Sequence, residues 1–468
     1  MSKFTLLLLF SFLCLCSAQS GRQTQQCQRL NQCQLRRIQA LRPQRRIESE
    51  GGITEMWLEN NDQFRCVGVA IIQQTIRPNS FLMPGKGLHS VIVPGCPETY
   101  QAGQQFSEST EGTQQGGARF QDEHQKVRRV REGDVVANPT GMVHWFHNDG
   151  NTDLILVSVI DTASNMNQLD HQLRKFYLGG DHGIQQKQHE QQEQTYYHGA
   201  RPEELQRFEA NNIFGGIDDQ ILQEVLGVSK DMVERIKSRG DLRGHMLRAK
   251  SGFQLIRPSK IEEEEGAGQC VATNDAEKNG LEETLCTARL RENIDKPSRA
   301  DVYNPQAGRL RTVNRLNLPV LRLMGMSAER GVLYKDALFA PHWNLNAHAI
   351  IYVTRGSARV QIVGNQQQSP VFDGQVQQGQ VLVVPQNFVV VKQAGPRGFE
   401  WVSFKTHDTA MIHSLAGKTS PFRGLPVDML ASMYQISRQE AENLKYNRGQ
   451  EVMIFAPSRR SPQGIATA

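Results

Sequence analysis

The sequence offers three groups of residues that could do chemistry: a histidine that follows a tight turn, six cysteines beyond residue 18, and an Asn-Gly bond. His144 comes shortly after Pro139 and Gly141, which predict a tight turn between two strands. From there its imidazole could point inward as a metal ligand. A metal site requires several inward-facing groups that converge on one ion, so the remaining strands decide whether His144 can bind a metal.

The segment from Gly133 to Asn148 is similar to the second motif of the cupin superfamily, with Pro139, Gly141 and His144 at the motif's positions. In a cupin that binds a metal, the resemblance implies that the other ligands are two His and a Glu, which belong to a first motif earlier in the domain. The stretch RPNSFLMPGKGLHSVIVPGC contains no His-x-His with a trailing Glu. His144 is left without visible partners, and we interpret it as a structural or exposed histidine near a turn.

In the second half of the chain the first motif lies at His342-Trp343-Asn344. By the resemblance its Glu position is Ala349, and the histidine position of the second motif is Val390. This half therefore predicts no metal site, and we expect no cofactor. The chain also lacks G-x-S-x-G, H-E-x-x-H and a Walker loop, so the sequence predicts a protein that is not an enzyme.

The elements that would position these residues are short strands. From Ile47 to about Val159, runs such as CVGVAII, HSVIV and LILVSVI are bounded by Gly, Pro and Asn, a pattern typical of an all-β sandwich or barrel. After an acidic stretch, strand patterns resume with HAIIYVTRG, SARVQIVG and GQVLVVP. Helical patterns cover 167–177 and 202–238, and Ser229 is a plausible cap for a second helix there.

An internal repeat organises the chain. At an offset of 208 positions, the segment from Gly216 matches the segment from Gly424: Leu222 corresponds to Leu430, Ser229 to Ser437, and Lys237 to Lys445. In the second copy Ser437 and Glu440 predict a capping box. Upstream, GDVVANP matches GQVLVVP. We therefore expect a mainly β bicupin, with two jelly-roll barrels that are each followed by a small helical subdomain.

Lys3 and a following apolar run of fewer than about 20 residues predict a signal peptide that is cleaved after Ala18, before Gln19. Two of the cysteines lie in this peptide and are removed with it. Secretion implies an oxidising compartment. The six remaining cysteines form no C-x-x-C pair, and their spacing does not fix their pairing. They are Cys27, Cys33, Cys66, Cys96, Cys270 and Cys286.

The segment NGLEETLC, which begins at Asn279 and Gly280, resembles the processing site of 11S seed storage globulins of the legumin type. In that family an asparaginyl endopeptidase of the storage vacuole cuts after the Asn. The charges are consistent with such a cut: residues 280–468 carry 22 basic and 14 acidic side chains, a net charge of +8, whereas residues 19–279 carry 30 basic and 34 acidic ones, a net charge of −4.

The resemblance to 11S globulins implies further features. Cys96 would join Cys286 across the cut, Cys33 would pair with Cys66, and trimers would become hexamers after cleavage. Compared with the legumin pattern, the segment Phe81–Gly87 is shortened by roughly ten to fifteen residues, which leaves the closure of the first barrel open. The state of Cys27 and Cys270 also stays open.

The expected function is a nutrient reserve in the protein storage vacuole of seeds, without nucleic acid as a partner and without membrane attachment after signal removal. A basic cluster from Arg36 to Arg46 is interpreted as part of a solvated arm. A metal-dependent bicupin enzyme and an extracellular sugar- or peptide-binding bicupin are the alternatives. The expected domains are a signal peptide (1–18), a Gln- and Arg-rich arm (19–46), an N-terminal cupin domain (47–245), an acidic linker with the processing site (246–292), a C-terminal cupin domain (293–456) and a tail (457–468).

Overall fold

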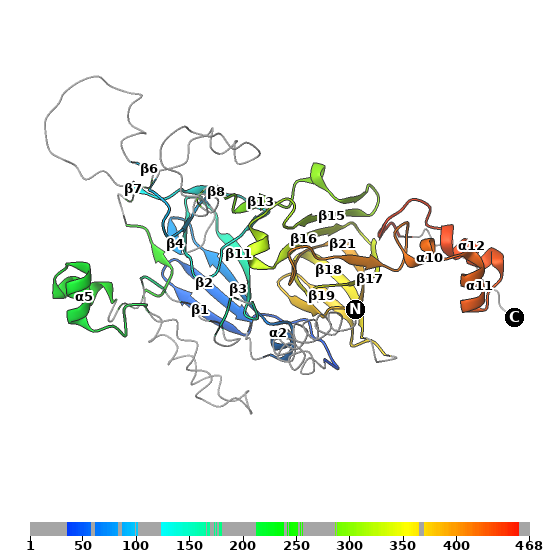
Figure 1. The fold of residues 1–468 in the computed structure, drawn as a ribbon, viewed down its shortest axis with the longest axis horizontal. Helices are drawn as coiled ribbons and strands as arrows, with labels where there is room; N and C mark the ends of the chain where they lie inside the picture. Colours follow the sequence, from blue (N-terminus) through cyan, green and yellow to red (C-terminus); the bar gives the residue numbers. More distant parts are fainter. Residues whose placement is uncertain are drawn as a thin grey trace, which may run out of the picture.

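The computed structural model places two β domains side by side, with a helical hairpin at each end of the long axis (Figure 1). The structure describes residues 35–57, 61–82, 87–98, 100–101, 123–164, 166–168, 173, 175, 177–179, 212–237, 241, 243–250, 253, 255, 286, 288–364 and 369–457. The predictions for Ala18, Gln19, Cys27, Cys33, Cys270, Asn279 and Gly280 concern residues outside these ranges. Among the described residues, no helix is both long and apolar enough to cross a membrane.

The N-terminal domain consists of two main sheets, in the orders β1-β2-β3-β11 and β12-β4-β10-β5-β8. Their strands are antiparallel. The elements of this domain are β1 (Arg45–Ser49), β2 (Gly52–Trp57), α2 (Asp62–Val67), β3 (Val69–Ile76), β4 (Ser80–Leu82), β5 (Gly87–Ile92), β6 (Tyr100–Gln101), β7 (Glu123–His124), β8 (Arg128–Val130), β9 (Asp134–Val136), β10 (Val143–Asn148), β11 (Leu154–Asp161), α5 (Asp219–Leu226), α6 (Lys230–Ile236) and β12 (Leu247–Arg248).

The C-terminal domain is built around one ten-stranded sheet, in which the long strands β18 and β21 pair along most of their length. Bulges in both strands curl the sheet. The elements are β13 (Arg291–Asn293), the 3-10 helix η2 (Pro297–Arg299), β14 (Val302–Asn304), β15 (Gly308–Val313), α9 (Leu321–Met324), β16 (Ser327–Leu333), β17 (Leu338–Asn344), β18 (Ala349–Val363), β19 (Phe372–Gln377), β20 (Val381–Val384), β21 (Val389–Lys405), β22 (Ile412–Ser414), α10 (Pro421–Gly424), α11 (Val427–Tyr434), α12 (Arg438–Tyr446) and β23 (Ile454–Phe455).

The two helical hairpins repeat each other in detail. Ser229 and Ser437 cap α6 and α12, and Ser437 forms the predicted capping box with Glu440. The ammonium of Lys237 donates to the carbonyl of Ile217, and 208 positions later the ammonium of Lys445 donates to the carbonyl of Leu425. The duplication that the sequence predicts is therefore confirmed down to single hydrogen bonds.

The helix expected over 167–177 is wrong for the residues that the structure describes there. None of them is helical, and Tyr177 instead forms an isolated parallel bridge with Asn212. The amide of Ile213 donates to the carbonyl of Tyr177 at 2.9 Å. A partner distant in sequence has taken the backbone groups that a helix would use, which periodicity alone does not reveal.

The arm expected as a solvated tail is in part a packed segment. Ile38 is 2% exposed and belongs to the hydrophobic core of the C-terminal domain. Its amide donates to the carbonyl of Val371, and Leu41 and Val381 exchange two backbone hydrogen bonds of 2.8 Å. Arg45 and Arg46 lie in β1. The end of the arm therefore forms a bridge from the first domain to the second.

A shared core joins the domains. One hydrophobic cluster combines Trp57, Phe64, Val67, Val69 and Ile71 of the first domain with Ile350, Tyr352, Val381 and Val383 of the second. The Trp57 and Tyr352 rings meet edge to face, and the Tyr352 hydroxyl donates to the Gln73 side chain at 2.7 Å. Burial of this hydroxyl raises its pKa to about 12, so it stays a hydrogen-bond donor.

Candidate functional site

The first place to look for chemistry is the interior of the N-terminal domain, where His144 lies. Gly133 and Gly141, the glycines of the motif, both have a φ of 80°, a left-handed conformation that glycine adopts without strain. They allow the turns before β10, and β10 then pairs with β5 so that Phe146 faces His89. The sequence therefore places His144 two residues before a position that lies directly opposite another histidine.

His89 is 1% exposed, and its Nε2 is 3.1 Å from the side-chain oxygen of Asn138. Its ring contacts the Phe146 ring at a centroid distance of 3.8 Å. Burial, with the nearby His144 and Arg128, holds the pKa of His89 well below its usual value. Burial and the ammonium of Lys175 also lower the pKa of His144. Both rings are therefore neutral at pH 7.

The second domain presents a different interior at the corresponding positions. His342 lies opposite Val390, the histidine position of the second motif. Its Nδ1 donates to the carbonyl of Ala340 at 2.7 Å, and its ring stacks on Phe339. Because a carbonyl can only accept, Nδ1 carries the proton of the neutral ring. Among the described residues of both domains, no three His, Cys, Asp or Glu side chains are grouped as metal ligands.

The residue that sequence reasoning missed is Lys392, two positions after Val390 on the same face of β21. It is 2% exposed, and its ammonium lies over the rings of Phe339 and Trp401. In the sequence it is a single cation in the run NFVVVKQAG. A lysine that directly follows three valines, at the alternate position to Val390, is the signal that could have identified it.

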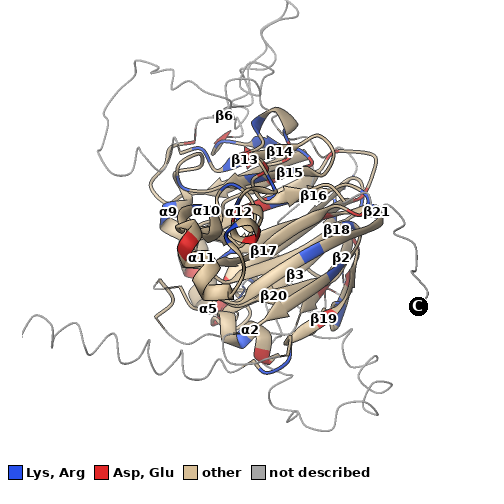
Figure 2. Ribbon diagram, turned by 90° about the vertical axis from the view of Figure 1, so that its right-hand side faces the viewer, with Lys and Arg blue, Asp and Glu red and all other residues tan. Residues whose placement is uncertain are grey.

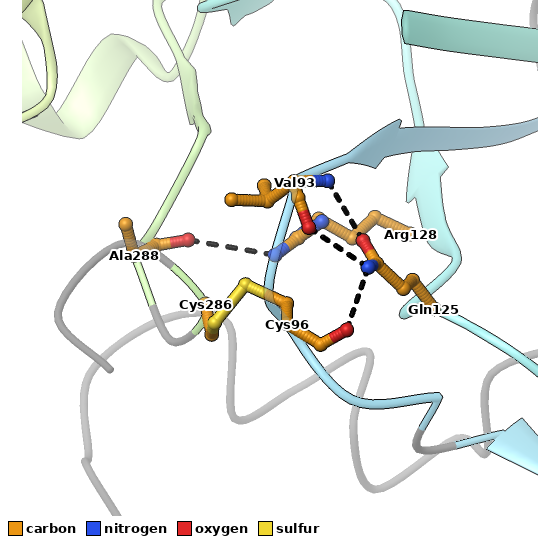
Figure 3. The surroundings of a disulfide bond; sticks show 6 residues. All are labelled: Val93, Cys96, Gln125, Arg128, Cys286 and Ala288. Carbon is orange, nitrogen blue, oxygen red and sulfur yellow. Dashed lines mark hydrogen bonds between the residues drawn. A yellow bond between two sulfur atoms is a disulfide. The ribbon is translucent and has the colours of Figure 1, made fainter. Parts of the chain in front are cut away.

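The second place of chemical interest is the disulfide between Cys96 and Cys286, which have a Cα–Cα distance of 5.5 Å, normal for such a bond. Figure 3 shows Gln125 beside it: the side-chain amide donates to the carbonyls of Val93 and Cys96, and its oxygen accepts from the Val93 amide. These three bonds fix the loop that carries Cys96. The bond connects the N-terminal domain to the chain just before β13.

Cys66, on α2, is also disulfide-bonded. The pairing with Cys33 stays a prediction.

Comparison with known proteins places these features in a family. The family model described as cupin matches residues 38–182 and 292–442. An 11S globulin seed storage protein, Ana o 2.0101 of Anacardium occidentale, is 44% identical over 458 residues, which cover 93% of this chain and 95% of that protein. The chain belongs to the 11S seed storage globulins.

Solved structures of 11S globulins agree with the fold. Pumpkin seed globulin matches with a TM-score of 0.74 and 40% identity, and coconut allergen cocosin with 0.75 and 38%. Each match covers 91% of this chain and 100% of the other. The legumin-type bicupin architecture that the sequence predicts is confirmed. Vicilin of Capsicum annuum, at 14% identity and a TM-score of 0.60, shares the fold alone.

Proposed function

We propose that this 11S globulin is a non-catalytic nitrogen reserve of the protein storage vacuole, made as a precursor and cut after Asn279. The observation that carries the proposal is the identity with seed storage globulins along nearly the whole chain. The interiors support it, because among the described residues neither domain groups metal ligands and the inward-facing His89 and His342 are buried with lowered pKa values.

The cut after Asn279 is supported by the opposite net charges of the two products and by the disulfide that begins seven residues later at Cys286. An asparaginyl endopeptidase should convert the precursor into an acidic and a basic chain. The products should run as one band on a denaturing gel without reductant and as two bands with it.

The test uses Asn279→Ala, with Asn274→Ala as the matched control, because both remove an asparagine from the same segment. We expect the control to be cut like the parent and Asn279→Ala to remain one chain. If Asn279→Ala still yields the same two fragments, the assignment of the processing site is wrong.

The assembly into a trimer is supported by exposed apolar side chains on both helical hairpins. The first hairpin exposes Ile221, Val225, Leu226 and Met232, and the second exposes Met429, Met433, Tyr434 and Leu444. The hairpins lie at opposite ends of the long axis (Figure 1). A contact between unlike ends is heterologous, and it closes into a ring when the rotation between subunits allows closure. We propose a ring of three, with stacking of two rings after cleavage.

A charge on one hairpin tests this assembly. Val225, on α5, is 75% exposed, so Val225→Asp should not disturb the fold but should place an unpaired charge in the contact. Light scattering should then find a monomer. The control is Ile155→Asp, on a 57% exposed strand position outside the hairpins. A Val225→Asp protein that remains trimeric would exclude α5 from the interface.

The partners that we propose are other copies of this chain and the endopeptidase that cuts it. Figure 2, which looks onto the helical end of the C-terminal domain, shows basic and acidic residues interspersed over its strands and helices. Interspersed charges of both signs on this side of the molecule do not favour a polyanion such as nucleic acid. Stoichiometric Mn, Fe or Zn in the purified protein would instead support the metal-dependent enzyme.

A further inference from the structure

The interior of the C-terminal domain contains a cluster of charged side chains that the storage function does not explain. Glu329 lies on β16, His342 on β17, and Lys392 and Lys405 on β21; each is at most 3% exposed. The ammonium of Lys405 is 2.6 Å from the carboxylate of Glu329. The neighbouring strands β18 and β20 contribute apolar side chains to the same core, such as Ile351, Val353, Val360 and Leu382.

The charges in this cluster do not balance. Lys405 and Glu329 neutralise each other, which leaves Lys392 as an uncompensated cation. Its Nζ lies 4.5 Å from the centre of the Phe339 ring and 5.0 Å from that of Trp401. No described residue accepts a hydrogen bond from it. Aromatic faces attract a cation but do not replace the hydrogen bonds that an ammonium loses on burial.

Two further donors in the same interior lack a hydrogen-bonded acceptor. The hydroxyl of Ser403 and the indole nitrogen of Trp401 are buried without a partner among the described residues. The indole N–H is near enough to the Glu329 carboxylate to favour its charge but makes no hydrogen bond of normal geometry. Ser403 on β21 is paired directly with Glu329 on the adjacent strand β16. Buried polar atoms without partners commonly mark a water or ion at that position.

We propose that this interior binds one small monovalent anion, a halide or a carboxylate of one or two carbons, on the ammonium of Lys392. Ser403 and Trp401 are further donors in this interior without a hydrogen-bonded acceptor among the described residues, and a carboxylate or halide can accept from such donors. The anion must be small, because Phe339 and Trp401 are both fully buried and their rings flank the ammonium. The anion should carry a single negative charge, because the cluster contains two ammonium groups, Lys392 and Lys405, and one carboxylate, Glu329.

Binding should be linked to the uptake of a proton. Burial lowers the pKa of Lys392 to about 7, against the opposing effect of Glu329. An anion in contact would raise that pKa, so the charged lysine and the anion stabilise each other. The affinity should therefore be greatest below pH 7 and fall by about tenfold per pH unit above it. Burial holds the pKa of His342 well below its usual value, and Lys405 and Lys392 lower that of Glu329 despite its burial, so neither group titrates in this range.

The direct test is a crystal structure of the full chain grown in sodium bromide at pH 6, because bromide scatters anomalously. We expect an anomalous peak within hydrogen-bond distance of Lys392 Nζ. The peak should be absent in Lys392→Met, whose apolar side chain still fills the space between the rings, and present in the control Lys418→Met, which changes an exposed lysine. A water at Lys392 or bromide only at the surface would overturn the proposal.

A solution test covers the case in which the variant packs differently. The melting temperature of the full chain should rise with added sodium formate at pH 6, and less at pH 9. Ser403→Ala should weaken this rise, and Lys392→Met should abolish it. An equal rise in the parent, Lys392→Met and Lys418→Met would show a general salt effect and reject the site. Neither test depends on cleavage or assembly, so the outcome is separate from that of the storage proposal.

Discussion

The packed end of the arm leads to a prediction that links Ile38 to a domain more than 250 residues later. Ile38 is 2% exposed in the C-terminal core, its amide donates to the carbonyl of Val371, and Leu41 nearby exchanges two backbone hydrogen bonds with Val381. Removing a buried isoleucine side chain typically costs about 2–5 kcal/mol. The arm lies at the edge of the domain and can relax, so we expect about 3 kcal/mol for Ile38→Ala.

The loss should be local as well as global. Because 1.4 kcal/mol corresponds to a factor of ten, about 3 kcal/mol should lower the hydrogen-exchange protection of the Leu41 and Val381 amides by roughly 100-fold if they open together. Peptides that cover 36–42 and 378–384 would report this by mass spectrometry. Ile155→Ala, at a 57% exposed position, is the control and should change stability by less than about 0.5 kcal/mol.

The result that would refute this reasoning is specific. If Ile38→Ala left the protection of Val381 unchanged, the two backbone hydrogen bonds between Leu41 and Val381 would not depend on Ile38. The arm would then lie on the surface of the second domain without contributing to its stability.

Three further predictions concern single contacts. Gly331→Ala should destabilise the C-terminal domain by at least about 1–3 kcal/mol in urea unfolding, because an added Cβ would lie 2.0 Å from the Trp401 ring. The control Gly216→Ala should be nearly neutral, because a Cβ added there has no atom within 4 Å. Lys445→Met should cost about 1–3 kcal/mol, because it removes the donor to the Leu425 carbonyl, and Lys237→Met should have a similar effect in calorimetry at the other hairpin. Burial lowers the pKa of His348 to about 4, and its Nδ1 accepts from the Gln386 amide. In the unfolded chain the His348 pKa is near 6.5, so as the pH falls the unfolded state is protonated before the folded state. The contribution of His348 to the free energy of unfolding should therefore be complete above about pH 6.5 and fall by up to about 3 kcal/mol as the pH drops to 4. His348→Gln should reduce this slope in melting curves, and an unchanged slope would contradict the assignment.

The features that the sequence predicts best are those in which local pattern and repetition agree. The hairpin residues Leu222 and Leu430 recur at a fixed offset, and both are buried as the periodicity predicts. The serine caps are local hydrogen bonds between neighbouring residues, so a short window contains all the information needed. The same holds for the turn at Gly141, whose positive φ follows from the motif.

The features that it predicts poorly depend on partners far away in the chain. Ile38 lies in a segment rich in Gln and Arg, and only the second domain supplies its core. Tyr177 pairs with Asn212 across residues that give no pairing signal. Lys392 was missed because a charge in a run of valines is read as an exposed position, whereas the curled sheet turns it inward.

What holds the protein together after a cut at 279 can be argued from the contacts on both sides of the segment. β12 ends at Arg248 and β13 begins at Arg291, so the proposed cut would fall between the last strand of the first domain and the first strand after it. β13 pairs with β9, which precedes the cut, and the arm pairs with β20, which follows it. The shared core and the disulfide add to these links. If the chain is cut as proposed, each product would complete the fold of the other, and reduction without denaturant should leave the two chains associated. Gel filtration of the cleaved protein in reductant tests this, and elution as two separate chains would show that the disulfide alone joins them.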